Sequence, residues 1–133
     1  KGIQRIAKAI EDVLGDRLTG GVVIAKHGDE LILDTIEVTF GAHPVPDEGC
    51  VKGCQRILEM ASNLREDDLV FTVVGNGVSS LLTLPVNGVT LEDVRQTTYQ
   101  MQQVYIATMT SCTITHLSIR SLILQPSRMP SDC

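Results

Sequence analysis

The stretch Leu69–Val74, LVFTVV, leads directly into Gly75–Ser80, GNGVSS, and this junction of an apolar run with a glycine-rich loop decides the predicted fold. An uncharged run rich in β-branched residues is typical of a strand that is buried on both faces of a parallel sheet. The glycines that follow permit the sharp turn by which such a strand passes into a helix. We therefore expect a central strand of an α/β sheet with a loop at its carboxyl end.

Two helices and two strands are predicted before this junction. Residues 2–14 repeat apolar side chains at helical spacing, and Gly20–Lys26 and Ile36–Phe40 are short runs typical of strands. Val51–Leu64 has a second helical pattern, and Asp47 is placed to cap it. This order predicts a Rossmann-like, open, mostly parallel sheet with helices on both faces, which is a three-layer αβα arrangement.

The chain changes character after the junction. Residues 90–93 (TLED) have the pattern of a helix start, and we expect that helix to reach about Val104. Residues 96–119 contain no Lys, Arg, Asp or Glu and show no clear period. We therefore divide the chain into a partial α/β domain at 1–95 and a divergent, Thr-rich segment at 96–133.

Composition narrows the class of protein and of partner. The 133 residues carry a formal net charge of −5, which argues against nucleic acid as a partner because such binding needs a basic face. No apolar run reaches the length of about 18 residues expected of a membrane span, and the amphipathic N-terminus is not a signal peptide. Four cysteines without an export signal indicate reduced thiols, so we expect a cytoplasmic protein.

The loop Gly75–Ser80 is the best candidate for a ligand site. Gly75 and Gly77 let a ligand approach the backbone, successive amides can bind an anion, and Ser79 and Ser80 add hydroxyl donors. Ligands of open α/β sheets bind at the carboxyl ends of strands, where this loop is predicted to lie. The loop lacks the ending of a Walker A motif and the third glycine of a dinucleotide fingerprint. A plain strand-to-helix turn therefore stays an alternative to phosphate binding.

Other candidate residues lie before the second predicted helix. His43 belongs to the rigid loop Gly41–Glu48 (GAHPVPDE), where it can contact substrate, carry a proton, or pin the loop by hydrogen bonding. Lys26–His27 is a basic spot at a strand end, for which a solvated turn is the simpler interpretation. Cys50 and Cys54 are four residues apart without a matching pair nearby, so we expect packing and predict no metal site.

Three blocks of the sequence together resemble the N-terminal domain of the glycerate 2-kinase family. They are residues 16–30 (DRLTGGVVIAKHGDE), 41–48 (GAHPVPDE) and 66–94 (EDDLVFTVVGNGVSSLLTLPVNGVTLEDV). The family pattern has L-T-G-G, G-H-P-x-P-D, an S-G-G-G-S-A loop and T-L-E-D in the same order and at similar spacing. Some members of the family carry older hydroxypyruvate reductase labels.

The resemblance implies a Rossmann-like domain, a smaller second domain and an active site between them. It also implies transfer of the ATP γ-phosphate to a hydroxyl of D-glycerate, with Mg²⁺. Lys1 falls on the lysine that closes the first glycine turn of the family, which implies a catalytic contact, and Gly75–Ser79 falls on the S-G-G-G-S loop. Asn76 and Val78 stand where the family has glycine, so this loop is a variant in which the Cβ of Val78 restricts the approach of a ligand.

The family's first strand would precede Lys1, and the resemblance fades beyond Gln102. We therefore expect an N-terminal fragment that is inactive alone and that forms a homo-oligomer through exposed apolar surface. Two alternatives stay open. One is a non-catalytic module that binds an anion, a nucleotide or another protein, and the other is a hydroxypyruvate reductase-type oxidoreductase, which would need the full dinucleotide fingerprint.

Overall fold

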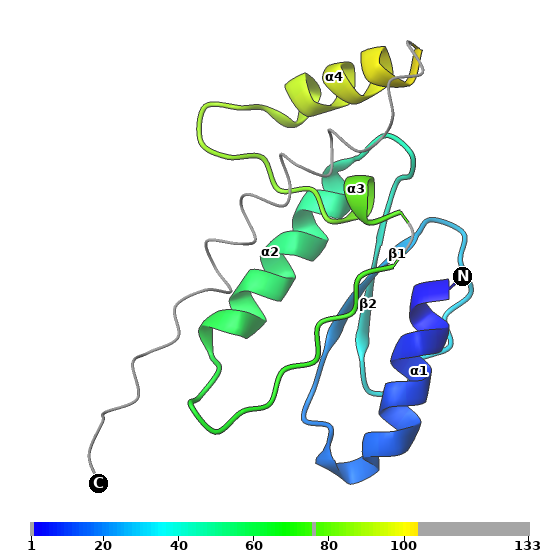
Figure 1. Cartoon of the computed structure of the whole chain (residues 1–133), viewed down its shortest axis with the longest axis vertical. Coiled ribbons are helices and arrows are strands. Elements are labelled where there is room, and N and C mark those ends of the chain that lie inside the picture. Colours follow the sequence, from blue (N-terminus) through cyan, green and yellow to red (C-terminus); the bar gives the residue numbers. More distant parts are fainter. Residues whose placement is uncertain (1, 76, 104–133) are drawn as a thin grey trace, which may run out of the picture.

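The computed structural model describes residues 2–75 and 77–103, and Figure 1 shows the arrangement of their helices and strands. The elements are α1 (Gly2–Leu14), the 3-10 turn η1 (Gly15–Arg17), β1 (Val22–Lys26), β2 (Glu37–Gly41), α2 (Glu48–Ser62), α3 (Val78–Leu81) and α4 (Leu91–Gln103). β1 and β2 form a parallel pair whose register runs from Val22 opposite Glu37 to Lys26 opposite Gly41. The described chain is therefore a partial α/β fold.

Helices cover both faces of this small sheet (Figure 1). Successive side chains of a strand point to opposite faces, so β1 contributes to two separate apolar clusters, one on each face. Val23 and Val38 pack with Ala7 of α1, whereas Ile24 packs with Cys54 of α2. The predicted order of helix, sheet and helix is confirmed in the described part of the chain.

α2 lies close to the sheet because a glycine faces the strands. A Cβ atom built on Gly53 would lie 2.7 Å from the Ile24 side chain and 2.7 Å from Oγ1 of Thr39. Cys50 and Cys54 fill the adjacent core, where they are 0% and 5% exposed. Burial raises the pKa of the Cys54 thiol to about 12, so it stays protonated and apolar in character. The packing role predicted for these two cysteines is confirmed.

The connection from β1 to β2 is anchored on α1 by one carboxylate. Glu11 is 6% exposed and accepts hydrogen bonds from the backbone N–H groups of Asp34, Thr35 and Ile36. The bond from Thr35 is the first of several that lower the pKa of Glu11 to about 2, and Lys8 adds an ion pair at 3.0 Å. This cluster holds the residues that lead into β2 against α1.

Both predicted capping residues, Asp47 and Thr90, are confirmed by their hydrogen bonds. Oδ1 of Asp47 accepts the N–H of Cys50 at 3.1 Å, although α2 begins three residues before the predicted Val51. Oγ1 of Thr90 accepts the N–H of Asp93 at 3.1 Å, and the Asp93 carboxylate accepts the N–H of Thr90 at 2.8 Å. α4 runs across residue 95 without a break, and residues 104–133 of the predicted Thr-rich segment lie outside the described residues.

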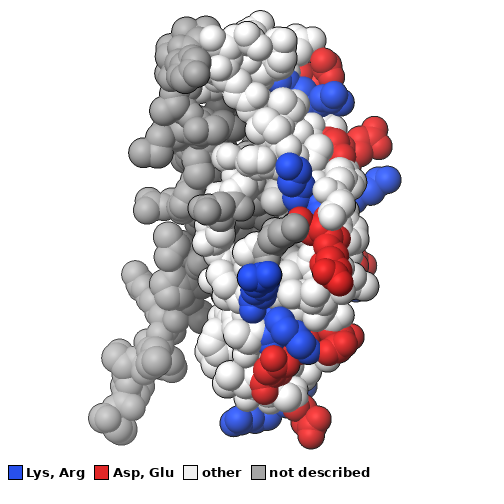
Figure 2. All heavy atoms as spheres, turned by 90° about the vertical axis from the view of Figure 1, so that its right-hand side faces the viewer, with Lys and Arg blue, Asp and Glu red and all other residues white. Residues whose placement is uncertain are grey.

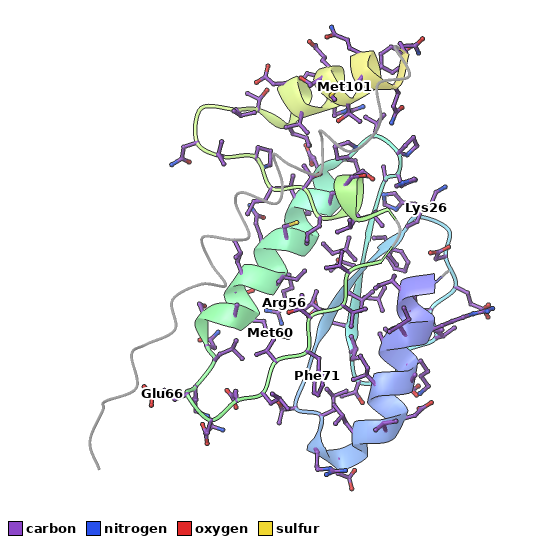
Figure 3. The ribbon with its side chains drawn as sticks, in the orientation of Figure 1. Lys26, Arg56, Met60, Glu66, Phe71 and Met101 are labelled. Atoms are coloured by element: carbon purple, nitrogen blue, oxygen red, sulfur yellow. The ribbon has the colours of Figure 1, made fainter. Side chains whose placement is uncertain are left out.

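The prediction of a central strand at Leu69–Val74 is wrong for the described residues. The described residues between α2 and α3 contain no strand, and Leu69, Phe71 and Val74 are 81%, 55% and 65% exposed. Phe71 is labelled on this segment in Figure 3. An apolar run forms a strand only where a neighbouring strand supplies hydrogen bonds and covering layers bury its side chains. Within residues 2–75 and 77–103 the sheet consists of β1 and β2, so this segment is not paired into it.

The charged side chains are mixed in sign on the face shown in Figure 2. Lys and Arg lie among Asp and Glu there, and they do not form one continuous basic area. Charges of opposite sign also pair within α1, where Nζ of Lys8 lies 3.0 Å from Glu11 and 3.1 Å from Asp12. No helix in the described ranges is both long enough and apolar enough to cross a membrane.

Candidate functional site

The carboxyl ends of β1 and β2 meet at one edge of the sheet because the strands are parallel. The chain leaves β1 through Lys26 and His27 and leaves β2 through the loop 42–47 (Figure 3). The N–H of His27 donates to the carbonyl of Gly41 at 3.0 Å, which ties the two exits together. This edge is where open α/β sheets place their ligand sites.

The structure brings His43 next to the glycine loop. A Cβ atom built on Gly77 would lie 3.2 Å from Cδ2 and 3.6 Å from Nε2 of His43. Gly77 has a φ of +90°, a left-handed conformation that favours glycine, and its carbonyl accepts the N–H groups of Ser80 and Leu81 at 3.2 and 3.0 Å. Gly77 therefore makes the turn into α3 and also leaves the space in which His43 lies.

The two serines of the loop differ in their surroundings. Ser80 is 1% exposed, and its hydroxyl donates to the carbonyl of Gly77 at 3.4 Å, which favours a structural role. Ser79 is half-buried beside Val78 at the start of α3, where the first amides of a helix have no intrahelical acceptor. These amides are the part of the loop that suits an anion. Phosphate binding by the loop stays a prediction.

Of the three remaining predicted site residues, the structure describes one. Gly75 lies against α1, because a Cβ atom built on it would be 3.4 Å from Cδ1 of Ile3. Lys1 and Asn76 lie outside the described residues, so their predicted contacts stay predictions.

Asp47 joins three segments at this edge and was predicted only as a helix cap. Oδ2 lies 2.7 Å from Nε2 of His27, and Oδ1 accepts the N–H groups of Ala42 and Cys50 at 3.0 and 3.1 Å. Partial burial alone raises the pKa of Asp47, but the bonds from His27, Ala42 and Cys50 outweigh it and hold this pKa well below its ordinary range. Asp47 is therefore an ionised carboxylate with a fixed orientation.

The described residues do not form a metal centre. Within 2–75 and 77–103 there is no group of three or more His, Cys, Asp or Glu side chains that could hold a metal ion. The pair His27–Asp47 brings together one imidazole and one carboxylate.

Comparison with known proteins identifies the family. Residues 1–109 match the family described as Domain of unknown function (DUF4147). The chain belongs to this family. It is 41% identical over 99 residues to D-glycerate 2-kinase of Thermotoga maritima and 38% identical over 98 residues to glycerate 2-kinase of Pyrococcus horikoshii. It is also 36% identical over 93 residues to a putative hydroxypyruvate reductase of Agrobacterium vitis.

This DUF4147 chain is also similar to solved structures of glycerate kinase and of a related protein. It superimposes on the crystal structure of glycerate kinase from Thermotoga maritima with a TM-score of 0.67 and 40% identity, over 74% of this chain and 24% of that one. A crystal structure of a protein from Pyrococcus horikoshii gives a TM-score of 0.70 and 34% identity, over 82% and 24% of the two chains. The resemblance to the N-terminal domain of glycerate 2-kinases is confirmed. The chain spans 24% and 22% of the length of the two glycerate 2-kinases.

Proposed function

We propose that this chain provides the phosphate-binding and substrate-binding edge of a glycerate 2-kinase, in which the γ-phosphate of ATP is transferred to a hydroxyl of D-glycerate. The observation that carries this proposal is the contact of His43 with the Gly77 turn at the carboxyl edge of the parallel sheet. Two glycerate 2-kinases at 41% and 38% identity support it, because their matched regions cover 74% of this chain.

The proposal gives each residue at the edge a role. The turn at Gly77 and the first amides of α3, from Val78 and Ser79, bind a phosphate group, and His43 contacts the substrate. Such a turn fits an anion because these amides have no intrahelical acceptor. Lys1 and Asn76 are assigned to the same phosphate site by the family resemblance alone.

ATP supplies the transferred phosphate, and the family implies Mg²⁺ as its metal. We assign none of the described residues to Mg²⁺, because no group of three or more His, Cys, Asp or Glu side chains lies together among them. Phosphoryl transfer requires groups that neutralise charge around the phosphates. We therefore expect the 133-residue chain to bind ligand without turnover, as a cytoplasmic protein that associates with itself.

The test is calorimetric titration with Mg·ATP, followed by a coupled assay with D-glycerate, on wild type and two glycine variants. Gly77→Ala places a Cβ atom 3.2 Å from His43, so we expect Mg·ATP to bind at least about tenfold more weakly. Gly88→Ala is the matched control, since Gly88 also has a left-handed φ, of +87°, but its Cβ would meet nothing within 4 Å. Gly88→Ala should bind as wild type does.

The outcomes of this titration distinguish the proposed function from its alternatives. Equal losses in both variants would make backbone strain the cause and would leave the His43 contact without a role. Wild type that binds neither ATP nor D-glycerate would overturn the proposal and favour the alternative, an interaction module in which the glycine loop is a plain turn. The exposed apolar side chains of Leu69, Phe71 and Val74 favour that module as the second candidate. Turnover would contradict the expected inactivity and would support the kinase function itself.

The oxidoreductase alternative has its own test. One relative is named a putative hydroxypyruvate reductase, but the loop Gly75–Ser80 of this chain lacks the third glycine of the dinucleotide fingerprint. We expect no oxidation of NADH or NADPH in the presence of hydroxypyruvate. Oxidation that depends on Gly77 would replace the kinase proposal.

A further inference from the structure

The pair His27–Asp47 lies at the carboxyl edge of the sheet and has no role in the function proposed above. Nε2 of His27 is 2.7 Å from Oδ2 of Asp47, and the His27 side chain is 55% exposed. The sequence at this turn suggests no more than a solvated basic spot, because its partner is 20 residues away. The bond gives this exposed ring a fixed partner.

The chemistry of the bond determines which ring nitrogen carries a proton. The depressed pKa of Asp47 makes its carboxylate ionised, and an ionised carboxylate only accepts hydrogen bonds. Nε2 of His27 must therefore donate, and in the neutral ring Nδ1 then carries the lone pair. Asp47 is itself held by the N–H groups of Ala42 and Cys50, so the ring is oriented by a carboxylate that cannot move freely.

A short series of contacts connects this ring with the glycine turn. Asp47 binds the amide of Ala42, the next residue is His43, and His43 lies against Gly77. The backbone of His27 is tied to the same loop through the carbonyl of Gly41. The imidazole therefore belongs to the edge on which the proposed function places its ligands.

We propose that His27 is a further substrate-contacting residue, whose Nδ1 accepts a hydrogen bond from a hydroxyl of a bound hydroxy acid. This inference rests on the proposed function, which brings a hydroxy acid to this edge. A hydroxyl group can donate to an imidazole lone pair, whereas a carboxylate or an ionised phosphate oxygen has no proton to donate to it. The role of Asp47 is to keep the lone pair on the nitrogen that faces away from the carboxylate.

The variant His27→Gln tests the contact. The glutamine amide can still donate an N–H to Asp47, but it has no acceptor at the position of Nδ1. D-glycerate should bind to His27→Gln about three- to tenfold more weakly than to wild type, because one hydrogen bond is lost. Inorganic phosphate, which needs only the glycine turn, should bind equally to both chains. Thermal unfolding of both chains establishes that the variant is folded.

Nitrogen NMR of the His27 ring provides an independent measurement. The ligand-free ring should be protonated at Nε2, and the Nδ1 resonance should move when D-glycerate is added. An unchanged D-glycerate affinity of His27→Gln, or an Nδ1 resonance that stays in place at saturation, would overturn this inference and leave the proposed function intact. Wild type that binds neither D-glycerate nor phosphate would overturn the proposed function, and this inference with it.

Discussion

At the scale of single residues, Asp47 performs two tasks with one carboxylate. Oδ1 caps α2 and binds the loop after β2, while Oδ2 binds His27 after β1. Hydrogen bonds to a charged acceptor are stronger than those between neutral groups. The side chain is therefore expected to contribute to stability as well as to the geometry of the edge.

Replacing Asp47 with asparagine should make the stability less dependent on pH. The pKa of Asp47 lies below its ordinary value of 3.8 in the folded chain, so its stabilising effect is present above that value and is lost as the pH falls below it. Asp47→Asn keeps a capping oxygen but loses the charge, which should cost about 1 kcal/mol at pH 7 and less at pH 3. Urea unfolding followed by circular dichroism measures both values.

The control for this measurement is Asp67→Asn, because the Asp67 side chain is 83% exposed in the loop after α2. Its unfolding curves should match those of wild type at pH 7 and at pH 3. A loss of stability in Asp47→Asn that is the same at both pH values would show that the charge of Asp47 is not its source.

The contrast between Asp47 and Glu11 shows which residue contacts sequence can predict. The cap at Asp47 was predicted because its acceptor and donor lie three residues apart, a spacing that belongs to every helix start. The bonds that Glu11 accepts from Asp34, Thr35 and Ile36 span 23 to 25 residues, and the bond that Asp47 accepts from His27 spans 20. Such contacts depend on how the elements pack, for which the sequence has no local pattern.

At the scale of elements, the distance between α2 and the sheet is set by Gly53. Alanine at this position would be the better helix former by about 1 kcal/mol. Its methyl group would, however, lie 2.7 Å from both Ile24 and Thr39, and overpacking of this kind costs about 1–3 kcal/mol. We expect Gly53→Ala to be less stable than wild type by up to about 2 kcal/mol, as measured by thermal unfolding.

Gly2→Ala is the matched control for Gly53→Ala. Gly2 is also a glycine in a helix, but a Cβ atom built on it would meet nothing within 4 Å. We expect its melting temperature to equal or slightly exceed that of wild type. A Gly53→Ala variant as stable as Gly2→Ala would mean that α2 lies farther from the sheet than the structure places it.

Most, but not all, of the elements near the sheet could be predicted from sequence patterns. The helix at 2–14 and the strands β1 and β2 follow from periodicity and from apolar runs bounded by turns, and the structure contains all three. Leu69–Val74 has the strongest strand pattern in the chain, yet the structure describes no strand there. The sequence pattern shows that a segment is apolar. Whether the segment forms a strand also depends on a neighbouring strand with which it can pair, and its own sequence does not show that neighbour.

At the scale of the whole molecule, the exposed apolar side chains of Leu69–Val74 are the basis on which we expect copies of the chain to associate. Leu69 and Val74 are 81% and 65% exposed, and apolar side chains gathered on one surface promote association. The extended segment also has no strand partner among the described residues, so its backbone is available to another chain. We expect concentration-dependent association of the wild-type chain through this segment.

The double variant Leu69→Lys, Val74→Lys should move the protein towards monomer in sedimentation velocity experiments over a wide concentration range. The two lysines remove apolar area from the contact between copies. They also place like charges on both copies, which repel each other at short distance. Val13→Lys is the control, because Val13 is also highly exposed, at 75%, but belongs to α1 and not to the segment. It should leave the association unchanged. A wild-type chain that stays monomeric at the highest concentration would remove the basis for the homo-oligomer, while an equal effect of Val13→Lys would show that association depends on overall charge and not on Leu69–Val74.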